Sequence, residues 1–195
     1  MQLLELPERE FDAYIFDCDG TLADSMGLHY VSWKRALKPH NAELPEDLYY
    51  SWGGRPTGEI VRSLNEMQGL FMDPEEVSLL KEKFYRELIP EVQPIESVVS
   101  IARAMHGKKP MAVASGGKRI SVQKTLSSLG LLDLFDVIVT AEDYKLGKPA
   151  PDPYLEAARR LGIKPSECLV FEDTETGRLS AAAAGMECIL VDSRK

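Results

Sequence analysis

Short apolar runs alternate with helical segments along the second half of the chain. The runs are rich in Val, Ile, Leu and Ala, which is typical of strands buried on both faces. These expected strands are residues 109–115, 136–143, 168–173 and 188–192. The segments between them have helical spacing and end on glycine, as a helix C-cap often does; they are 119–130, 151–162 and 176–185. Strands separated by helices predict parallel pairing in a doubly wound, Rossmann-like α/β sheet.

The first half of the chain has a different pattern. Residues 12–17, DAYIFD, predict one more buried strand of the same sheet. Residues 25–93 have apolar positions three and four apart and no strand-like run, which favours an inserted helical cap domain. The α/β core domain would then consist of residues 1–24 and 94–195. Ligands bind at the carboxyl edge of open α/β sheets, so the cap would cover the binding edge.

Composition restricts the classes of function. The chain has 195 residues and a formal net charge of −8, and it lacks the clustered Lys and Arg that a nucleic-acid surface needs. No run of eighteen apolar residues and no basic leader occurs, so we expect a cytoplasmic protein without membrane partners. Cys18, Cys168 and Cys188 are odd in number and lack C-x-x-C spacing, so neither a disulfide framework nor a zinc site is indicated.

Two acidic residues follow the first expected strand. Asp17 and Asp19 are two positions apart on extended chain, so both side chains can face one ligand, and Gly20 permits a tight turn. Carboxylates this close repel each other unless a cation lies between them or one keeps a proton. An Asx turn is the ordinary alternative. A calcium loop does not fit, because Leu22 and Leu28 occupy the positions of its glycine and glutamate.

A second acidic pair lies at the end of another expected strand. Glu172 and Asp173 close the segment VFED, and solvated acids before a helix N-terminus are the ordinary interpretation in isolation. Together with Asp17 and Asp19, however, they would place four carboxylates at one edge of the sheet. Hard oxygen ligands in that number suit Mg²⁺ with a substrate phosphate.

Two further segments favour an anion at this edge. Ser115 ends an expected strand and precedes Gly116, Gly117 and a helix, so a hydroxyl and free backbone N–H groups could seat a phosphate. Lys148 lies in the loop GKPAPDP and would answer the negative charges of the acids and the phosphate. Taken alone, the first segment is an ordinary turn and the second a solvated lysine.

These motifs together resemble those of a known family. The order is D-x-D-G-T-L, a serine at a strand end, Gly-Lys-Pro-x-Pro, and Glu-Asp-x-x-x-Gly. This set resembles the haloacid dehalogenase-like hydrolase superfamily, and the helical insertion resembles the cap of its β-phosphoglucomutase-like branch. The resemblance implies a Mg²⁺-dependent enzyme, most often a phosphatase acting on a small phosphorylated metabolite such as a sugar phosphate.

The resemblance also implies roles for individual residues. Asp17 matches the nucleophile that forms an aspartyl-phosphate, and Asp19 matches the acid/base. In the family the metal is held by the positions of the Asp17 side chain, the Asp19 main-chain carbonyl and Asp173, with Glu172 close by. The residues matching those that hold the phosphoryl oxygens are Ser115 and Lys148, with Gly116 in the same turn.

The cap and the cavity entrance offer four more candidates for substrate contact. His29 matches a histidine near the leaving group, although helix packing would also explain it. Arg55 lies in the turn WGGRPTG, one residue from the arginine of the mutases, and is otherwise a solvated cation. Lys118 and Arg119 follow the phosphate turn and could meet a second anionic group, where the mutase pattern has Lys then Asn.

Three functions remain open at this point. The departures at Arg55 and at Lys118 with Arg119 favour a phosphatase over a β-phosphoglucomutase-type hexose-phosphate mutase. A non-catalytic binding module is less favoured, because it needs no nucleophile and acid together. The expected partner is a small phosphorylated substrate, and the sequence does not distinguish a monomer from a dimer.

Overall fold

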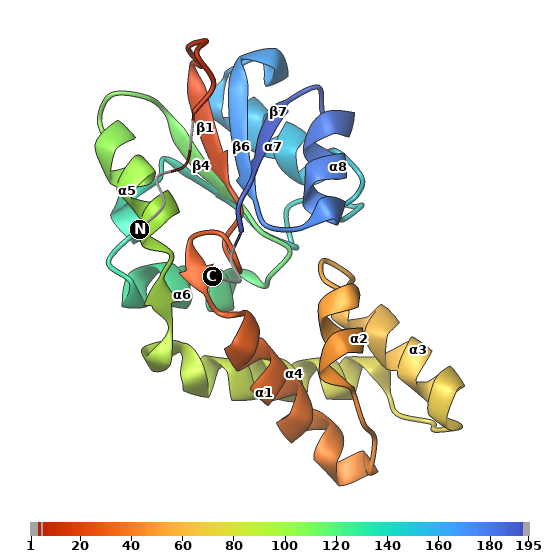
Figure 1. The fold of residues 1–195 in the computed structure, drawn as a ribbon. Coiled ribbons are helices and arrows are strands. Elements are labelled where there is room, and N and C mark those ends of the chain that lie inside the picture. The colour runs from red at the N-terminus through yellow and green to blue at the C-terminus, as the bar shows by residue number, and fades with distance from the viewer. Residues whose placement is uncertain (1–3, 5, 193–195) are drawn as a thin grey trace.

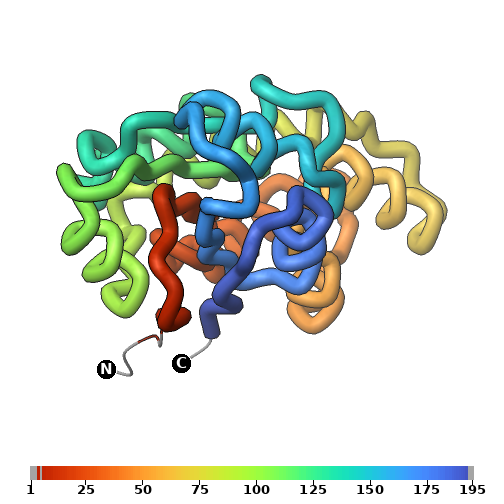
Figure 2. The backbone as a smooth tube through the Cα atoms, turned by 90° about the horizontal axis from the view of Figure 1, so that it is seen from above, coloured from red at the N-terminus to blue at the C-terminus, as the bar shows by residue number. Residues whose placement is uncertain are grey.

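A five-stranded parallel sheet forms the centre of the core (Figure 1). The computed structural model describes residue 4 and residues 6–192. The strand order is β5-β4-β1-β6-β7, and the central β1 pairs in parallel with β4 and β6. Figure 2 shows β1, in red, between green and blue segments of the chain. The strands are β1 (Ala13–Phe16), β4 (Met111–Ala114), β5 (Val137–Val139), β6 (Cys168–Glu172) and β7 (Glu187–Leu190).

Helices cover both faces of this sheet, which confirms the doubly wound α/β class. Phe16 faces the apolar cluster of α5 and α6, whereas its neighbour Ile15 faces the cluster of α7 and α8. Successive side chains of a strand point to opposite faces, so nearly every strand position is apolar. The helices are α5 (Glu96–Met105), α6 (Arg119–Ser128), α7 (Asp152–Leu161) and α8 (Glu175–Ala183).

Residues 26–88 form a helical layer with its own apolar cluster. Trp33, Leu64 and Val77 are among the buried side chains of that cluster. The helices are α1 (Met26–Leu37), α2 (Glu46–Ser51), α3 (Thr57–Gln68) and α4 (Pro74–Leu88). Short 3₁₀ turns are η1 (Lys38–His40), η2 (Ile89–Glu91), η3 (Leu132–Leu134) and η4 (Pro165–Glu167).

A small antiparallel ribbon connects this layer to the core. It consists of β2 (Ala23–Asp24) and β3 (Gln93–Pro94), and the backbone N–H of Ile95 donates to the Leu22 carbonyl. The expected cap boundaries lie beside this ribbon, and we keep them as proposed domain boundaries. Two short crossings leave the helical layer at the carboxyl edge of the sheet (Figure 1).

Some elements differ from the sequence expectation. The strand expected at 136–143 is only three residues long, because the Asp143 carboxylate accepts hydrogen bonds from the backbone and hydroxyl of Thr140 and closes a turn. Helices α2 and α5 were not predicted. Within the described residues, none of the helices combines the length and apolar character that crossing a membrane requires.

Candidate active site

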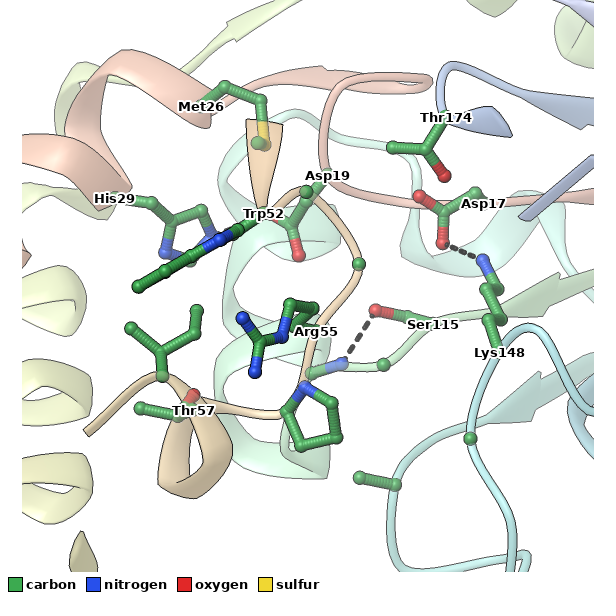
Figure 3. A pocket seen from close by; sticks show the side chains of 18 of the residues that line it. Asp17, Asp19, Met26, His29, Trp52, Arg55, Thr57, Ser115, Lys148 and Thr174 are labelled. Carbon is green, nitrogen blue, oxygen red and sulfur yellow. Dashed lines mark hydrogen bonds and ion pairs between the residues drawn. The ribbon is translucent and has the colours of Figure 1, made fainter. Parts of the chain in front are cut away.

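A cavity of about 300 Å³ lies between the carboxyl edge of the sheet and the cap (Figure 3). Asp17 and Ser115 line it from the core, and His29, Trp52 and Arg55 line it from the cap. The strand ends and the inserted helices therefore meet around one space.

The turn after β1 presents both aspartates to this cavity. Asp17 and Asp19 line it, while Cys18 between them is fully buried in the core, as expected. Gly20 has a φ of +85°, and a Cβ there would overlap the Asp173 carboxylate, 2.1 Å from Oδ2. Glycine therefore allows the turn and also allows the two acidic loops to approach each other.

Lys148 bridges two acids at the bottom of the cavity. Its Nζ donates to Asp17 Oδ1 at 2.8 Å and to Glu172 Oε1 at 2.6 Å, and it lies 5.0 Å from the Tyr154 ring centre. Burial alone would lower the Lys148 pKa, but the two carboxylates raise it well above its usual value. Burial raises the pKa of Asp17 well above its usual value, and the nearby ammonium counteracts part of this rise. The Lys148 ammonium thus balances only part of the buried negative charge.

Three carboxyl groups form a cluster that fits a divalent cation. Asp17, Glu172 and Asp173 each offer an oxygen, and these oxygens lie within 4.8 Å of one another. Burial and the neighbouring Glu172 raise the Asp173 pKa to about 7. The donor atoms are all oxygens, and their negative charge exceeds the single positive charge that Lys148 supplies. Such a donor set suits Mg²⁺. Among the described residues, the Asp19 side chain is not part of this cluster, and the contact of its main-chain carbonyl with a metal stays a prediction.

Glu172 is held by neighbours on both of its oxygens. Oε1 accepts from Lys148, and Oε2 accepts from the backbone N–H and the hydroxyl of Thr174 at 2.7 and 2.9 Å. Gly177 faces this carboxylate so closely that a Cβ would lie 1.8 Å from Oε1. The glycine of the Glu-Asp-x-x-x-Gly motif therefore makes room for Glu172.

The expected phosphate turn follows β4. Ser115 is buried, and its Oγ accepts from the Gly117 backbone N–H at 3.0 Å, which closes the turn beside the cavity (Figure 3). Gly116 and Gly117 also line the cavity. Tyr144, which sequence analysis did not single out, lines it too and donates to the Ser115 carbonyl at 3.2 Å.

Asp19 accepts three hydrogen bonds on one oxygen. Its Oδ1 lies 2.6 Å from Ser25 Oγ, 3.1 Å from His29 Nε2 and 3.3 Å from the Tyr85 hydroxyl. Burial alone would raise the Asp19 pKa, but His29 and Ser25 hold it well below its usual value. Asp19 also lines the cavity.

His29 is in turn oriented by a buried lysine. Lys81 Nζ lies 2.9 Å from His29 Nδ1 and donates to Glu82 Oε1 at 3.0 Å. Burial and Lys81 lower the pKa of His29. An ammonium can only donate, so Nδ1 must accept and the imidazole proton lies on Nε2, facing Asp19. His29 is thus a neutral donor to Asp19.

Sequence analysis missed Lys81, Glu82 and Tyr85. A signal was present, because Lys81 lies four residues after Val77 and four before Tyr85, on the buried face of α4. A lysine at an apolar position of an amphipathic helix is rarely buried without a partner. Its position therefore indicates a polar neighbour across the helix interface.

The cap turn that carries Arg55 lies close to the acidic loop. The Arg55 guanidinium lies 4.8 Å from the Trp52 ring centre and donates to Ser63 Oγ at 3.0 Å. Gly54 has a φ of +82°, and a Cβ there would lie 3.3 Å from Thr176 Cβ. Arg55 therefore reaches the cavity from a turn that is itself packed against the core.

The remaining two candidates lie elsewhere. Among the residues that the structure describes, the cavity wall does not include Lys118 or Arg119. The Arg119 guanidinium pairs with Asp143, and its backbone N–H donates to Glu142. Their proposed contact with a second anionic group would need these side chains to move.

Comparisons with known proteins identify the family of the chain. The model of the haloacid dehalogenase-like hydrolase family matches residues 11–185, so the chain belongs to this family of hydrolases. It is 34% identical over 176 residues to the fructose-1-phosphate phosphatase YqaB of Escherichia coli, covering 90% of this chain and 93% of the relative. It is 31% identical to the validoxylamine A 7'-phosphate phosphatase of Streptomyces hygroscopicus subsp. limoneus, covering 90% and 83%.

A solved structure shows the same fold. The β-phosphoglucomutase from Clostridium difficile superimposes with a TM-score of 0.84 at 24% identity, covering 92% of this chain and 84% of that one. This likeness agrees with the doubly wound α/β fold described above.

Proposed function

We propose that this hydrolase is a Mg²⁺-dependent phosphatase that hydrolyses a small sugar phosphate through an aspartyl-phosphate on Asp17. The observation that supports this proposal most strongly is that one cavity is lined by Asp17, Asp19, Ser115, Lys148 and the Glu172–Asp173 pair. The names of two relatives, which act on fructose 1-phosphate and on a phosphorylated validoxylamine, support the substrate class.

In the first step an oxygen of the Asp17 carboxylate attacks phosphorus. The bond from phosphorus to the leaving oxygen breaks, and Asp19 in its protonated form gives that oxygen a proton. In the second step Asp19, now ionised, takes a proton from water. The water oxygen attacks phosphorus, the bond to Asp17 breaks, and inorganic phosphate is released.

The hydrogen bonds to Asp19 suit the second of these steps. His29, Ser25 and Tyr85 all donate to Oδ1, and donors favour the ionised carboxylate that accepts a proton from water. For the first step the proton of Asp19 would lie on its other oxygen, while Oδ1 continues to accept from these donors. Movement of the cap, which carries His29 and Tyr85, would change their contacts with Oδ1 together.

Several core groups would hold the transferring phosphate. Lys148 and the Ser115 hydroxyl, with the backbone N–H groups of the turn at Gly116, offer donors beside Asp17. Asp17 and Asp173, with the Asp19 carbonyl, would hold Mg²⁺, and Glu172 would support the site through Lys148. When bound, the ion supplies positive charge that reduces repulsion between Asp17 and the phosphate.

The cap side of the cavity favours a polar organic group on the substrate. Trp52 offers an aromatic face, and Arg55 and Lys81 offer donors. A mutase would also need a firm seat for a second phosphate, and the Arg119 guanidinium is already paired with Asp143. These contacts support a phosphatase over the mutase alternative.

Product analysis tests the proposal. The purified protein with Mg²⁺ should release inorganic phosphate from fructose 1-phosphate or another sugar phosphate in a panel that also holds nucleotides and pyrophosphate. It should not convert glucose 1-phosphate to glucose 6-phosphate. Isomer conversion without phosphate release would favour the mutase, and no turnover of any phosphate ester would contradict both.

A further inference from the structure

Polar side chains join the cap to the core beside the cavity, on the side of α6. Glu82 Oε2 of cap helix α4 accepts a hydrogen bond from Ser121 Oγ of core helix α6 at 2.7 Å. One helical turn further along both helices, the Tyr85 hydroxyl lies 2.9 Å from Thr125 Oγ1. All four residues are buried, with the Glu82 side chain only 10% exposed. Helix α4 is thus fastened to α6 at two points.

This fastening is connected to Asp19 and to the phosphate turn. Helix α6 begins at Arg119, directly after the turn of Ser115 and Gly117. The Tyr85 hydroxyl donates to Asp19 and accepts from the Thr125 hydroxyl of α6, and His29 reaches Asp19 from the neighbouring helix α1. Helices α1 and α4 pack against each other in the cap, so a shift of α4 on α6 would move His29 and Tyr85, two of the three donors to Asp19.

We propose that Glu82 and Ser121 form a latch that holds the cap closed and sets the position of His29 and Tyr85 on Asp19. The inference deepens the proposed function and rests on it for its kinetic consequences. Glu82 and Ser121 are positioning residues, because they act on Asp19 through α4 and its neighbours.

The arrangement of charge makes such a latch reversible. A buried ion pair is costly to break when opening leaves one partner without the other. Here Lys81 and Glu82 both belong to α4, so their pair moves with the cap and stays intact when the cap opens. On the side of α6, opening then exchanges the Ser121 and Thr125 contacts for contacts with water, at a modest net cost for each hydrogen bond. Glu82 therefore binds the core through one neutral hydroxyl while its charge is balanced inside the cap.

Two small substitutions break the latch, one from its core side and one from its cap side. Ser121→Ala removes the donor and leaves Lys81 and Glu82 unchanged. Glu82→Asp keeps the charge but shortens the side chain by about 1.5 Å, so it no longer spans to Ser121. Matched controls are Ser127→Ala and Glu87→Asp, because both residues are exposed on the same two helices.

Kinetics and solution scattering test the proposal together. With Mg²⁺ and fructose 1-phosphate, each latch variant should lose kcat/KM by roughly tenfold, the scale of a hydrogen bond to a charged group, and the double variant should lose no more than either single one. Small-angle scattering without substrate should show a larger radius of gyration for all three variants. The controls should match the wild type in both measurements, and thermal unfolding should show that every variant is folded.

Two results would overturn the latch. One is a radius of gyration equal to that of the wild type in both single variants. The other is a loss of kcat/KM in the double variant that equals the product of the two single losses, because independent sites behave in that way. Scattering also separates this inference from the proposed function. If the wild-type protein hydrolyses no phosphate ester, the radius of gyration still reports whether Glu82 and Ser121 hold the cap closed.

Discussion

Lys148 lies 2.8 Å from Asp17, so the proposed nucleophile is in direct contact with a buried cation before any substrate binds. The same ammonium contacts Glu172 at 2.6 Å, and β1 and β6, which carry the two acids, are neighbours in the sheet. The loop after β5 thereby links the two central strand ends. This contact keeps the Asp17 carboxylate in place and lowers the cost of its charge.

Asp17→Asn should abolish turnover and leave the fold intact. The amide is nearly isosteric with the carboxylate but cannot attack phosphorus, so the aspartyl-phosphate cannot form. Phosphate release under single-turnover conditions measures the effect, and circular dichroism checks the fold. Turnover near that of the wild type would show that Asp17 is not the nucleophile.

Removal of the metal should stop activity, and Mg²⁺ should restore it. Asp173 belongs to the carboxylate cluster, and Thr21 Oγ1 is its hydrogen-bond donor, at a long 3.4 Å. Asp173→Ala should therefore raise the Mg²⁺ concentration needed for half-maximal activity steeply, while leaving Asp17 and Lys148 in contact. A Mg²⁺ titration of wild type and variant, started from chelator-treated protein, tests this. Full activity in excess chelator would mean that the three acids serve structure alone.

Gly177→Ala should lower both stability and activity. Within a helix this change usually stabilises by about 0.5–1 kcal/mol, but here the new Cβ would lie 1.8 Å from the buried Glu172 carboxylate. Overpacking costs roughly 1–3 kcal/mol, so the steric effect should win. It should also displace Glu172 from Lys148. Thermal unfolding and kcat measure the two effects.

Gly27→Ala is the matched control for that substitution. Gly27 also lies in a helix, and a Cβ there would meet nothing within 4 Å. This variant should be as stable as the wild type or more stable, with unchanged kcat. If both variants behave alike, the crowding of Glu172 has no energetic consequence.

The core could be predicted from sequence because its signals are local. Apolar runs such as residues 13–16 form strands that are buried on both faces, and glycine marks the end of a helix, as Gly162 does with a φ of +73°. The acidic residues of the motifs come directly after these apolar runs. Because parallel strands end at the same edge of a sheet, their meeting at the carboxyl edge could be predicted from the pairing alone. The length of the strand at 137–139 was overestimated, because the strand ends at a turn that the Asp143 side chain closes. A pattern of apolar residues gives no sign of such a contact.

The cap side of the site could not be predicted in the same way. The partners of Lys81 come from α1 and from the adjacent Glu82, and Ser121 comes from a helix of the core. Such contacts depend on how two layers pack, and the spacing within one helix can indicate that a polar neighbour is needed but does not identify the residue on the facing helix. Arg119 shows the same limit, since its pairing with Asp143 joins the start of α6 to the loop after β5.

Arg55 offers the sharpest test of how the cap recognises a substrate. Its guanidinium lines the cavity, lies over Trp52 and donates to Ser63, so it is positioned rather than freely solvated. If it binds the non-reacting part of a sugar phosphate, Arg55→Ala should lower kcat/KM for that substrate by roughly tenfold or more, the scale of a charged hydrogen bond.

The same variant should matter far less for p-nitrophenyl phosphate, which has no hydroxylated group for Arg55 to hold. Arg62→Ala is the matched control, because Arg62 is an exposed arginine on the following helix α3 and should affect neither substrate. Equal losses on both substrates would place Arg55 on the reacting phosphate or in support of the cap fold. No loss on either would mean that its contacts with Trp52 and Ser63 serve only the turn, and that sugar recognition depends on other residues of the cavity wall.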